Sequence, residues 1–357
     1  MGTVKIGAVQ APVALVDFHL ERLAAAIDSA EANLAAVAAA VDRAGAAGCA
    51  AAVLTEDTLG VHKWLAAHPS LVRPALLRLV PRLLAELGAV AAARGLHVVC
   101  ASDALAGGAV YSTAFLIGPD GELAGTYHKV NLPYCEAGSR RRGTGYPVFA
   151  AGALGPVGLL VCHDMVFPEP LRCLALAGAG MVFVPTMGVA SVGADDLGEL
   201  GFRMRAADNG VYLVVAYRRA GSMVISPRGE LLARGDGELV AAAVDPAGGR
   251  EGGNAFDTQA DFRARLFRER VPQSYGLLGE PQPPVLARLP DSGSPVAITR
   301  RAAAVMTRGE DEFAAAETLL RAGERAAARR LFERLCEQYA GAWIERAARQ
   351  RLATLET

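Results

Sequence analysis

The feature that most constrains the fold is a Pro-x-Gly-Glu-Leu turn that occurs twice between runs of β-forming residues. It stands at 119–123 within the segment 111–129, and again at 227–231 within the segment 221–235. Proline fixes one turn residue and glycine supplies the backbone freedom of a tight turn, so each copy predicts an antiparallel hairpin. The recurrence suggests two similar halves related by a pseudo-twofold axis.

Short apolar runs alternate with helix-forming stretches over residues 1–271. Strands are expected at 4–10, 51–55, 97–102, 156–162, 181–185, 211–216 and 239–244. Helices are expected at 19–48, 74–94, 168–178 and 197–209. Pro81 is expected to kink or break the second of these helices. Strands alternating with helices, together with two hairpins, predict a layered α/β domain with mixed sheets.

The final part of the chain has a different composition. Six prolines fall within 272–305, so an extended linker is expected there. From about Glu310 the chain is rich in Ala, Arg, Glu and Leu, and Gly323 and Gly341 divide it into three short helices. The segment 306–357 resembles a tetratricopeptide-type helical hairpin with one more helix. Because such repeats need about three units to stand alone, it is expected to dock on the main domain or on another subunit.

The charge and the cysteines narrow the class of partner. Lys and Arg number 36 against 37 Asp and Glu, a net charge of -1, so nothing favours nucleic acid or an anionic membrane over a small molecule. Six cysteines without a CxxC pair are not a disulfide framework and fit a reducing, cytoplasmic compartment. The N-terminus has no signal-peptide pattern. The uncharged stretch 173–192 is long enough to cross a bilayer, but its glycines and Pro185 favour a buried helix, turn and strand.

Three residues at predicted strand ends have side chains suited to nucleophilic catalysis. Cys162 ends an apolar strand and precedes a helix, whose N-terminus favours a thiolate and an oxyanion. Glu56 also ends a strand, where it is a candidate general base. Lys129 follows the first hairpin and is a candidate for a fixed positive charge beside an oxyanion. Taken singly, each has a simpler interpretation: a buried thiol, a solvated or capping acid, and a lysine lying along an apolar surface.

The order Glu, Lys, Cys and the residues around it resemble the nitrilase, or carbon–nitrogen hydrolase, superfamily. The matching pieces are LTE at Glu56, HKVNLP at Lys129 and GLLVCHDMVFPE at Cys162, with KIGAVQAP and MRAADNGVYLVVA on either side. The resemblance covers roughly 3–270. It implies a four-layer α-β-β-α sandwich, here with a small all-α appendage at the C-terminus, and homo-oligomers that join sheets across subunits. It also implies a catalytic triad of Glu56, Lys129 and Cys162, with Glu136 as an auxiliary acid and without a metal or organic cofactor.

The chemistry of that triad explains the residue types. Glu56 would take the proton of Cys162, whose sulfur attacks a carbonyl or nitrile carbon. Lys129 and the backbone N–H of His163 would hold the negative oxygen or nitrogen, and one such donor is typically worth ~3–4 kcal/mol of barrier. Glu136 would orient Lys129 or the substrate nitrogen. No HxxxH or CxxC pattern supports a metal site.

Departures from the superfamily pattern bear on the substrate. Nitrilases tend to read Cys-Trp-Glu, whereas this chain has Cys-His-Asp at 162–164, which favours an amide or N-carbamoyl substrate. Met187 lies where a tryptophan commonly borders the pocket and is a candidate substrate contact. Arg140 begins an arginine run in a glycine-rich loop, and it is a candidate for bidentate binding of a substrate carboxylate. The favoured alternative for this loop is a solvated segment or an oligomer contact.

Several functions remain open from the sequence. Hydrolysis of a small linear amide with release of ammonia comes first, an N-carbamoyl substrate second, and a nitrile third. Acyl transfer from the same thioester to an amine is a further enzymatic alternative. A catalytically inactive scaffold that recruits a partner through the helical tail is the non-enzymatic one, and the intact set of Glu56, Lys129 and Cys162 argues against it.

Overall fold

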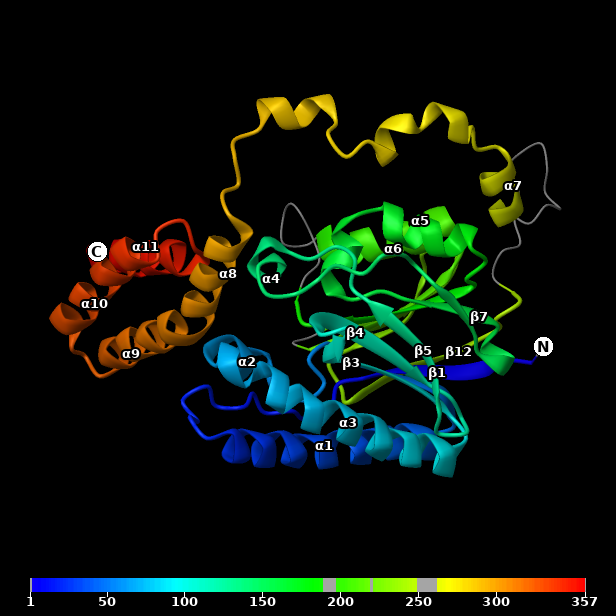
Figure 1. The fold of residues 1–357 in the computed structure, drawn as a ribbon, viewed down its shortest axis with the longest axis horizontal. Coiled ribbons are helices and arrows are strands. Elements are labelled where there is room, and N and C mark those ends of the chain that lie inside the picture. The colour runs from blue at the N-terminus through cyan, green and yellow to red at the C-terminus, as the bar shows by residue number, and fades with distance from the viewer. Residues whose placement is uncertain (1, 189–196, 219–220, 249–261, 357) are drawn as a thin grey trace.

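The computed structural model describes residues 2–188, 197–218, 221–248 and 262–356. Within them the chain forms two six-stranded sheets stacked face to face (Figure 1). In spatial order, the first sheet comprises β12 (Leu239–Val244), β1 (Val4–Val9), β2 (Cys49–Leu54), β3 (His97–Ala106), β4 (Ala109–Ile117) and β5 (Leu123–His128). The second comprises β11 (Leu231–Gly235), β10 (Ser222–Ile225), β9 (Tyr212–Tyr217), β8 (Met181–Thr186), β7 (Pro156–Leu159) and β6 (Val148–Ala150).

Each sheet has three parallel strands in its interior and a hairpin at one edge. Strands β1, β2 and β3 are parallel, as are β7, β8 and β9. The predicted hairpins are β4–β5 and β10–β11, and they extend the two sheets by antiparallel pairing. Their turn glycines, Gly121 and Gly229, have φ of 84° and 80°, which glycine adopts without steric cost.

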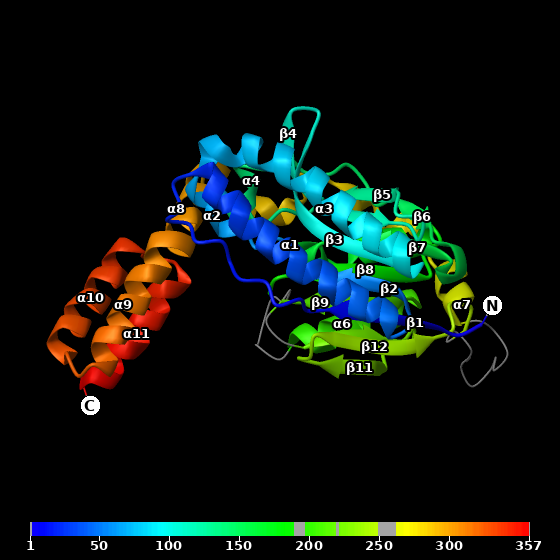
Figure 2. The same cartoon turned by 90° about the horizontal axis from the view of Figure 1, so that it is seen from below.

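Helices cover the outer face of each sheet and complete the predicted four layers. Helices α1 (Leu23–Ala46) and α3 (Val72–Arg94) pack together on the first sheet, while α5 (Glu169–Leu176) and α6 (Leu197–Asn209) lie on the second (Figures 1 and 2). Helix α3 continues through Pro81. Of the two outcomes expected at this proline, a kink or a break, the break is therefore wrong. Its buried leucines before and after the proline pack against the same core.

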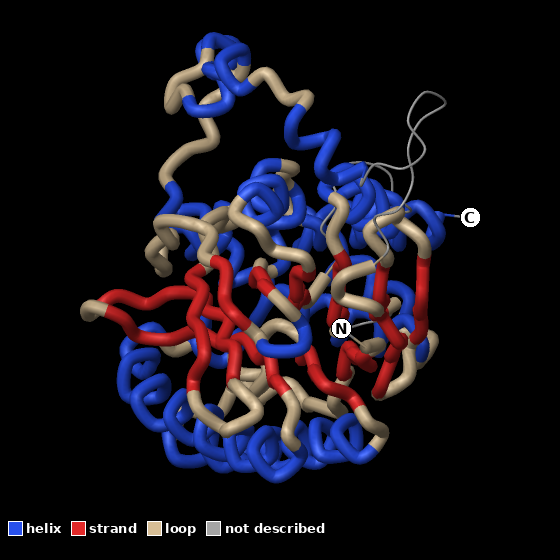
Figure 3. The backbone as a smooth tube through the Cα atoms, turned by 90° about the vertical axis from the view of Figure 1, so that its right-hand side faces the viewer, coloured by secondary structure: helices blue, strands red, loops and turns tan. Residues whose placement is uncertain are grey.

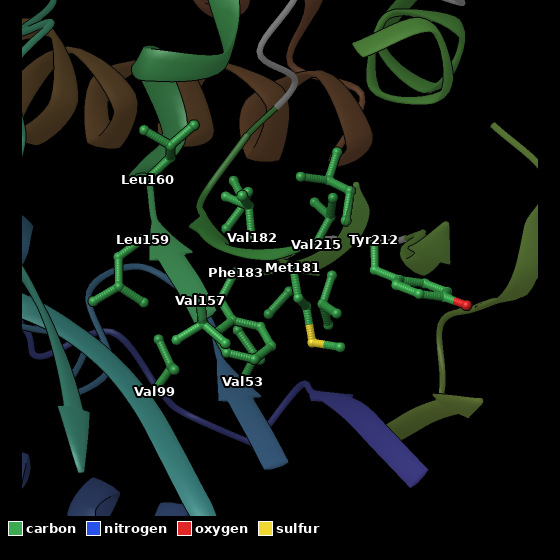
Figure 4. Close-up of a cluster of buried hydrophobic side chains, with 14 of the residues drawn as sticks. Val53, Val99, Val157, Leu159, Leu160, Met181, Val182, Phe183, Tyr212 and Val215 are labelled. Atoms are coloured by element: carbon green, nitrogen blue, oxygen red, sulfur yellow. The ribbon is translucent and has the colours of Figure 1, made fainter. Parts of the chain in front are cut away.

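The inner faces of the two sheets form the main core. Val53 and Val99 from the first sheet approach Val157, Phe183 and Val215 from the second (Figure 4), and all five side chains are fully buried. Fully burying such side chains stabilises the fold by about 1.5–3 kcal/mol each. The β-branched and aromatic residues that predicted these strands therefore also join the two sheets.

One helix has the length and composition of a membrane span. This is α1, but its apolar residues pack against α3 and β2, as in the core helix of a folded domain. The uncharged stretch 173–192 has the expected structure over its described residues. They form the end of α5, a turn and the buried strand β8. Residues 189–192 of that stretch lie outside the described residues.

The expected linker is shorter than 272–305. After α7 (Phe262–Arg268) the chain forms short 3-10 turns at Pro272–Ser274, Gly276–Gly279 and Pro284–Arg288, passing from α7 to α8 on the α5 and α6 side of the domain (Figures 1 and 3). Helix α8 then spans Pro295–Ala304 and continues through a π-helical turn at Val305–Gly309. Pro295 occupies the first turn of α8, where backbone N–H groups have no partner within the helix, so the missing N–H of proline costs no helical hydrogen bond.

Three further helices complete the tail: α9 (Glu310–Arg321), α10 (Arg325–Gln338) and α11 (Trp343–Glu356). As predicted, they are divided at Gly323 and Gly341, whose φ values are 83° and 79°. They share a small core of their own around Phe332 and Leu335. The tetratricopeptide-like character of this unit stays a prediction.

The tail docks on the main domain through α8, as expected for so short a helical unit. The Thr299 hydroxyl accepts a hydrogen bond from Gly138 N (2.9 Å) and donates one to Tyr134 O (3.2 Å), both on or beside α4 (Tyr134–Ala137). A Cβ on Gly138 would lie 2.7 Å from Val296 Cα, so the two backbones meet only because this residue is glycine. Lys63 of α2 (His62–Ala67) pairs with Glu310, and His19 with Asp311 at 2.6 Å.

Candidate active site

The three predicted catalytic residues follow strands of both sheets and meet between them. Glu56 lies two residues after β2, Lys129 directly after β5, and Cys162 three residues after β7. Ligands of open α/β sheets bind beyond the carboxyl ends of their parallel strands, and these side chains converge in that place. The structure therefore brings together residues separated by more than one hundred positions in the chain.

Lys129 lies between two carboxylates. Its Nζ is 3.1 Å from Glu56 Oε1, and 3.4 and 3.2 Å from the two oxygens of Glu136 on α4. The lysine side chain is 1% exposed. Burial opposes its charge, but Glu56 and Glu136 outweigh burial and hold the pKa of Lys129 well above its ordinary value. The ammonium is therefore a permanent positive charge at this point.

Glu136 is correspondingly held as a carboxylate. Burial alone would raise its pKa, but Lys129, Arg140 and His62 lower it to about 2. The carboxylate contacts the same lysine as Glu56 does, so two acids share one buried cation. This agrees with a role for Glu136 in orienting Lys129.

Cys162 has an unusual backbone conformation. Its φ is 44°, and among the described residues the only other non-glycine residue with positive φ is Asp57, next to Glu56. Such conformations cost about 1–3 kcal/mol and concentrate at functional sites. The expectation that Cys162 ends a strand needs correction, because β7 stops at Leu159 and Cys162 begins the 3-10 helix Cys162–Val166.

The Cys162 thiol is protonated at neutral pH. Burial and the neighbouring Glu56 raise its pKa to about 12, against the opposing effects of Lys129, the Thr186 hydroxyl and the Met187 N–H. A thiol in this state becomes a nucleophile only if a base takes its proton as it attacks. Glu56 lies near enough to the thiol to raise its pKa, and its Oε2 accepts a hydrogen bond from Met187 N at 3.2 Å.

Asp164 was not singled out in the sequence, and it fixes the turn that carries Cys162. It is completely buried. Its Oδ1 accepts from Asn131 N (2.9 Å) and Asn131 Nδ2 (3.2 Å), and its Oδ2 accepts from Tyr127 OH (2.7 Å) and Val161 N (3.0 Å). These bonds tie the turn at Cys162 to the segments on both sides of Lys129. Apart from an acid two positions after the cysteine, no local pattern pointed to these bonds.

A second set of hydrogen bonds, which was also not predicted from the sequence, holds the backbone at Glu56. The Arg218 guanidinium donates to the backbone carbonyls of Glu56 (3.2 Å) and Asp57. The Asp57 carboxylate accepts from Val61 N (2.9 Å) and His62 N (3.2 Å) at the start of α2. Burial raises the pKa of Asp57 to about 6, although Arg218 lowers it. The left-handed turn after Glu56 is therefore fixed from both sides.

The remaining candidates lie around this centre. His163 follows Cys162, and its ring packs edge-on against Phe167 with centroids 5.6 Å apart. Met187 lines the same small cavity as Glu56, Glu136 and Arg140. Arg140 is buried there, with two nitrogens each 2.6 Å from Asp103 oxygens, so the solvated-loop interpretation is wrong for this residue. Arg141 and Arg142 of the same run are exposed.

A family model described as carbon–nitrogen hydrolase matches residues 5–251, which is most of the chain. The chain belongs to the carbon–nitrogen hydrolase family. Within the described residues, His, Cys, Asp and Glu side chains form no cluster of three or more suited to a metal ion.

Curated relatives are similar over part of their length. A deaminated glutathione amidase of Synechocystis is 34% identical over 146 residues, covering 35% of this chain and 53% of the relative. The human deaminated glutathione amidase is 30% identical, with coverages of 48% and 56%, and a Pyrococcus abyssi nitrilase is 32% identical, with coverages of 40% and 56%. The matched region thus spans about half the length of these relatives.

Solved structures match the sandwich. An amidase from Nesterenkonia sp. superposes with a TM-score of 0.56 at 25% identity, covering 75% of this chain and 97% of that protein. In one structure of that amidase the acetamide moiety of fluoroacetamide is covalently added to the active-site cysteine. The uncovered quarter of this chain leaves room for the additional C-terminal helices.

Proposed function

We propose that the chain hydrolyses the carbon–nitrogen bond of a small linear amide or N-carbamoyl compound, releasing ammonia through a thioester on Cys162. The observation that carries this proposal is the Lys129 ammonium between the carboxylates of Glu56 and Glu136, beside a cysteine in a left-handed conformation. The matched family, and relatives named as amidases, support the same class of reaction.

The first half of the reaction forms the thioester. Glu56 accepts the thiol proton while the Cys162 sulfur bonds to the amide carbon, because a thiol with a pKa of about 12 does not ionise in advance. Lys129 and the His163 N–H stabilise the negative oxygen of the tetrahedral intermediate. The carbon–nitrogen bond then breaks, and Glu56 returns the proton to the departing ammonia.

The second half releases the acid. Glu56 takes a proton from water, and the resulting hydroxide bonds to the thioester carbon. The carbon–sulfur bond breaks, and the Cys162 sulfur recovers a proton from Glu56. Lys129 stays protonated throughout, since both neighbouring carboxylates raise its pKa. Glu136 holds the ammonium in place and is a positioning residue in this scheme.

The test is ammonia release from linear amides, N-carbamoyl amino acids and nitriles, comparing the wild type with Cys162→Ala. The matched control is Cys173→Ala, which alters an exposed thiol on α5. We expect release from an amide that Cys162→Ala abolishes and Cys173→Ala preserves, with the acyl adduct on Cys162 visible by intact mass. Cys162-dependent release from a nitrile alone would change the substrate class, while release from an amide alone or from a carbamoyl compound alone would choose between the two proposed classes. An adduct without ammonia-forming turnover would point to acyl transfer, and neither signal would point to a scaffold.

A further inference from the structure

A second cavity, of about 390 Å3, lies between the main domain and the C-terminal helices. This size is within the range of about 300–1,000 Å3 that small-molecule sites occupy. Helix α2, the part of the β3–β4 hairpin near its turn, and α4 form its domain side, while α8 and the turn after it form the other. The apolar side chains that matter here are Leu65, Val72, Val110, Val296, Ala303 and Met306.

This apolar cavity adjoins the candidate active site. His62, Asp103 and Arg140 line it, and the same three residues line the cavity that contains Glu56 and Glu136. The two spaces are therefore separated by one layer of side chains.

The side chains of that layer differ in how firmly they are held. Arg140 and Asp103 form a buried two-bond ion pair, with both contacts at 2.6 Å. The ring of His62 contacts this pair through a bond of 3.1 Å from Arg140. His62 is half-buried, begins α2 and lines both spaces, and this one hydrogen bond joins it to the ion pair.

Helix α4 contributes side chains to the lining of both cavities. Glu136 contacts Lys129, while its chain neighbour Cys135 lines the apolar cavity. Met187 lines the small cavity, and its N–H bonds both to Glu56 Oε2 and to the Cys162 sulfur. A carboxamide held in that cavity beside Glu56 therefore has an apolar space next to it on the far side of His62. At the boundary Arg140 and Asp103 are already paired. Arg300, which is exposed, adds one positive charge to a lining that is otherwise mostly apolar, so the apolar part of the space favours a hydrocarbon group.

We infer that this cavity binds the acyl chain of the substrate, so that the preferred substrates are amides with an apolar chain of several carbons. This rests on the proposed function and adds the substrate class to it. Because Val296, Ala303 and Met306 line one side of the cavity, the C-terminal helices limit the size of the chain that fits. The tail is then part of the specificity of the enzyme.

The direct test is kcat/KM for acetamide, butyramide, hexanamide and octanamide. Each methylene transferred from water to an apolar site contributes about a fourfold gain, so kcat/KM is expected to rise by about that factor per carbon until the cavity is full. Ala303→Phe, from α8, and Val110→Phe, from β4, each place a ring in the cavity. Both should bring kcat/KM for hexanamide down to that for acetamide in the same variant, so that the ratio of the two falls to about one. Ala304→Phe is the matched control, because Ala304 is exposed on the same helix.

A binding test does not depend on turnover. In the Cys162→Ala variant, saturating hexanamide should slow alkylation of Cys135 by N-ethylmaleimide at least about fivefold, while acetamide should not. Cys173, exposed on α5, is the internal reference and should react at an unchanged rate.

The outcomes separate this inference from the proposed function. Cys162-dependent ammonia release from acetamide without a gain for longer amides, and without protection of Cys135, would overturn the inference alone. Protection of Cys135 without a chain-length effect on kcat/KM would also overturn the inference. It would indicate that the cavity binds a ligand other than the acyl chain of the substrate. Absence of Cys162-dependent release from every amide and every N-carbamoyl compound would overturn the proposed function.

Discussion

Replacing Glu136 by Gln tests whether two carboxylates are needed around Lys129. The folded protein lowers the pKa of Glu136 from 4.5 to about 2. Lowering the pKa by that amount corresponds to roughly 3 kcal/mol of folding stability at neutral pH. Because the folded-state pKa is the lower one, this contribution is present above pH 4.5 and is lost as the pH falls towards 2. Glutamine keeps the shape of the side chain and removes the charge.

The assay is urea unfolding of wild type and Glu136→Gln between pH 7 and pH 3. The variant should be less stable by about 3 kcal/mol at pH 7 and by only about 1.5 kcal/mol at pH 3. Glu122→Gln is the control, since Glu122 is exposed on a hairpin turn, and it should change stability by less than about 0.5 kcal/mol. A difference for Glu136→Gln that is the same at every pH would refute the electrostatic reasoning.

Three further outcomes are expected. Asp164→Asn places an amide where two donors converge, so it should lower the free energy of unfolding in urea by about 2–4 kcal/mol and also lower kcat. An unchanged free energy of unfolding would contradict the role of Asp164 in holding the turn at Cys162. Phe183→Ala would leave a cavity between the sheets, so it should lower the free energy of unfolding by about 3–5 kcal/mol in the same assay. The fraction of the variant that is folded should keep its kcat. Light scattering during size-exclusion chromatography should give a multiple of 37.1 kDa, and a monomer would count against the predicted homo-oligomer.

Most of the sandwich could be predicted because its signals are local. The two Pro-x-Gly-Glu-Leu turns specify hairpins through the geometry of proline and glycine, and the apolar runs that become β8 and β9 are buried on both faces. Glu56 and Lys129 closely follow such strands and could be located for the same reason, whereas Cys162 lies three residues beyond β7. Their meeting in one place rests on the resemblance and on the stacking of two sheets.

The rest depends on contacts between distant segments. Helix α2 has only six residues and begins where the Asp57 carboxylate accepts the N–H groups of Val61 and His62, so it has no apolar period to detect. The four hydrogen bonds of Asp164 and the docking of α8 on α4 arise only after the strands have paired. Proline frequency predicted an extended segment over 272–305 and did not distinguish Pro295, which starts a helix.

The left-handed backbone at Cys162 sets a limit on how this protein can evolve. A glycine at that position would adopt a φ of 44° without the penalty of about 1–3 kcal/mol that a side chain incurs. Selection for stability alone would therefore replace the proposed nucleophile, and only selection for its reactivity retains it. Descendants of this chain that lose their substrate should drift towards glycine or other small residues at position 162 while becoming more stable, so the identity of this one residue would record which lineages still carry out the reaction.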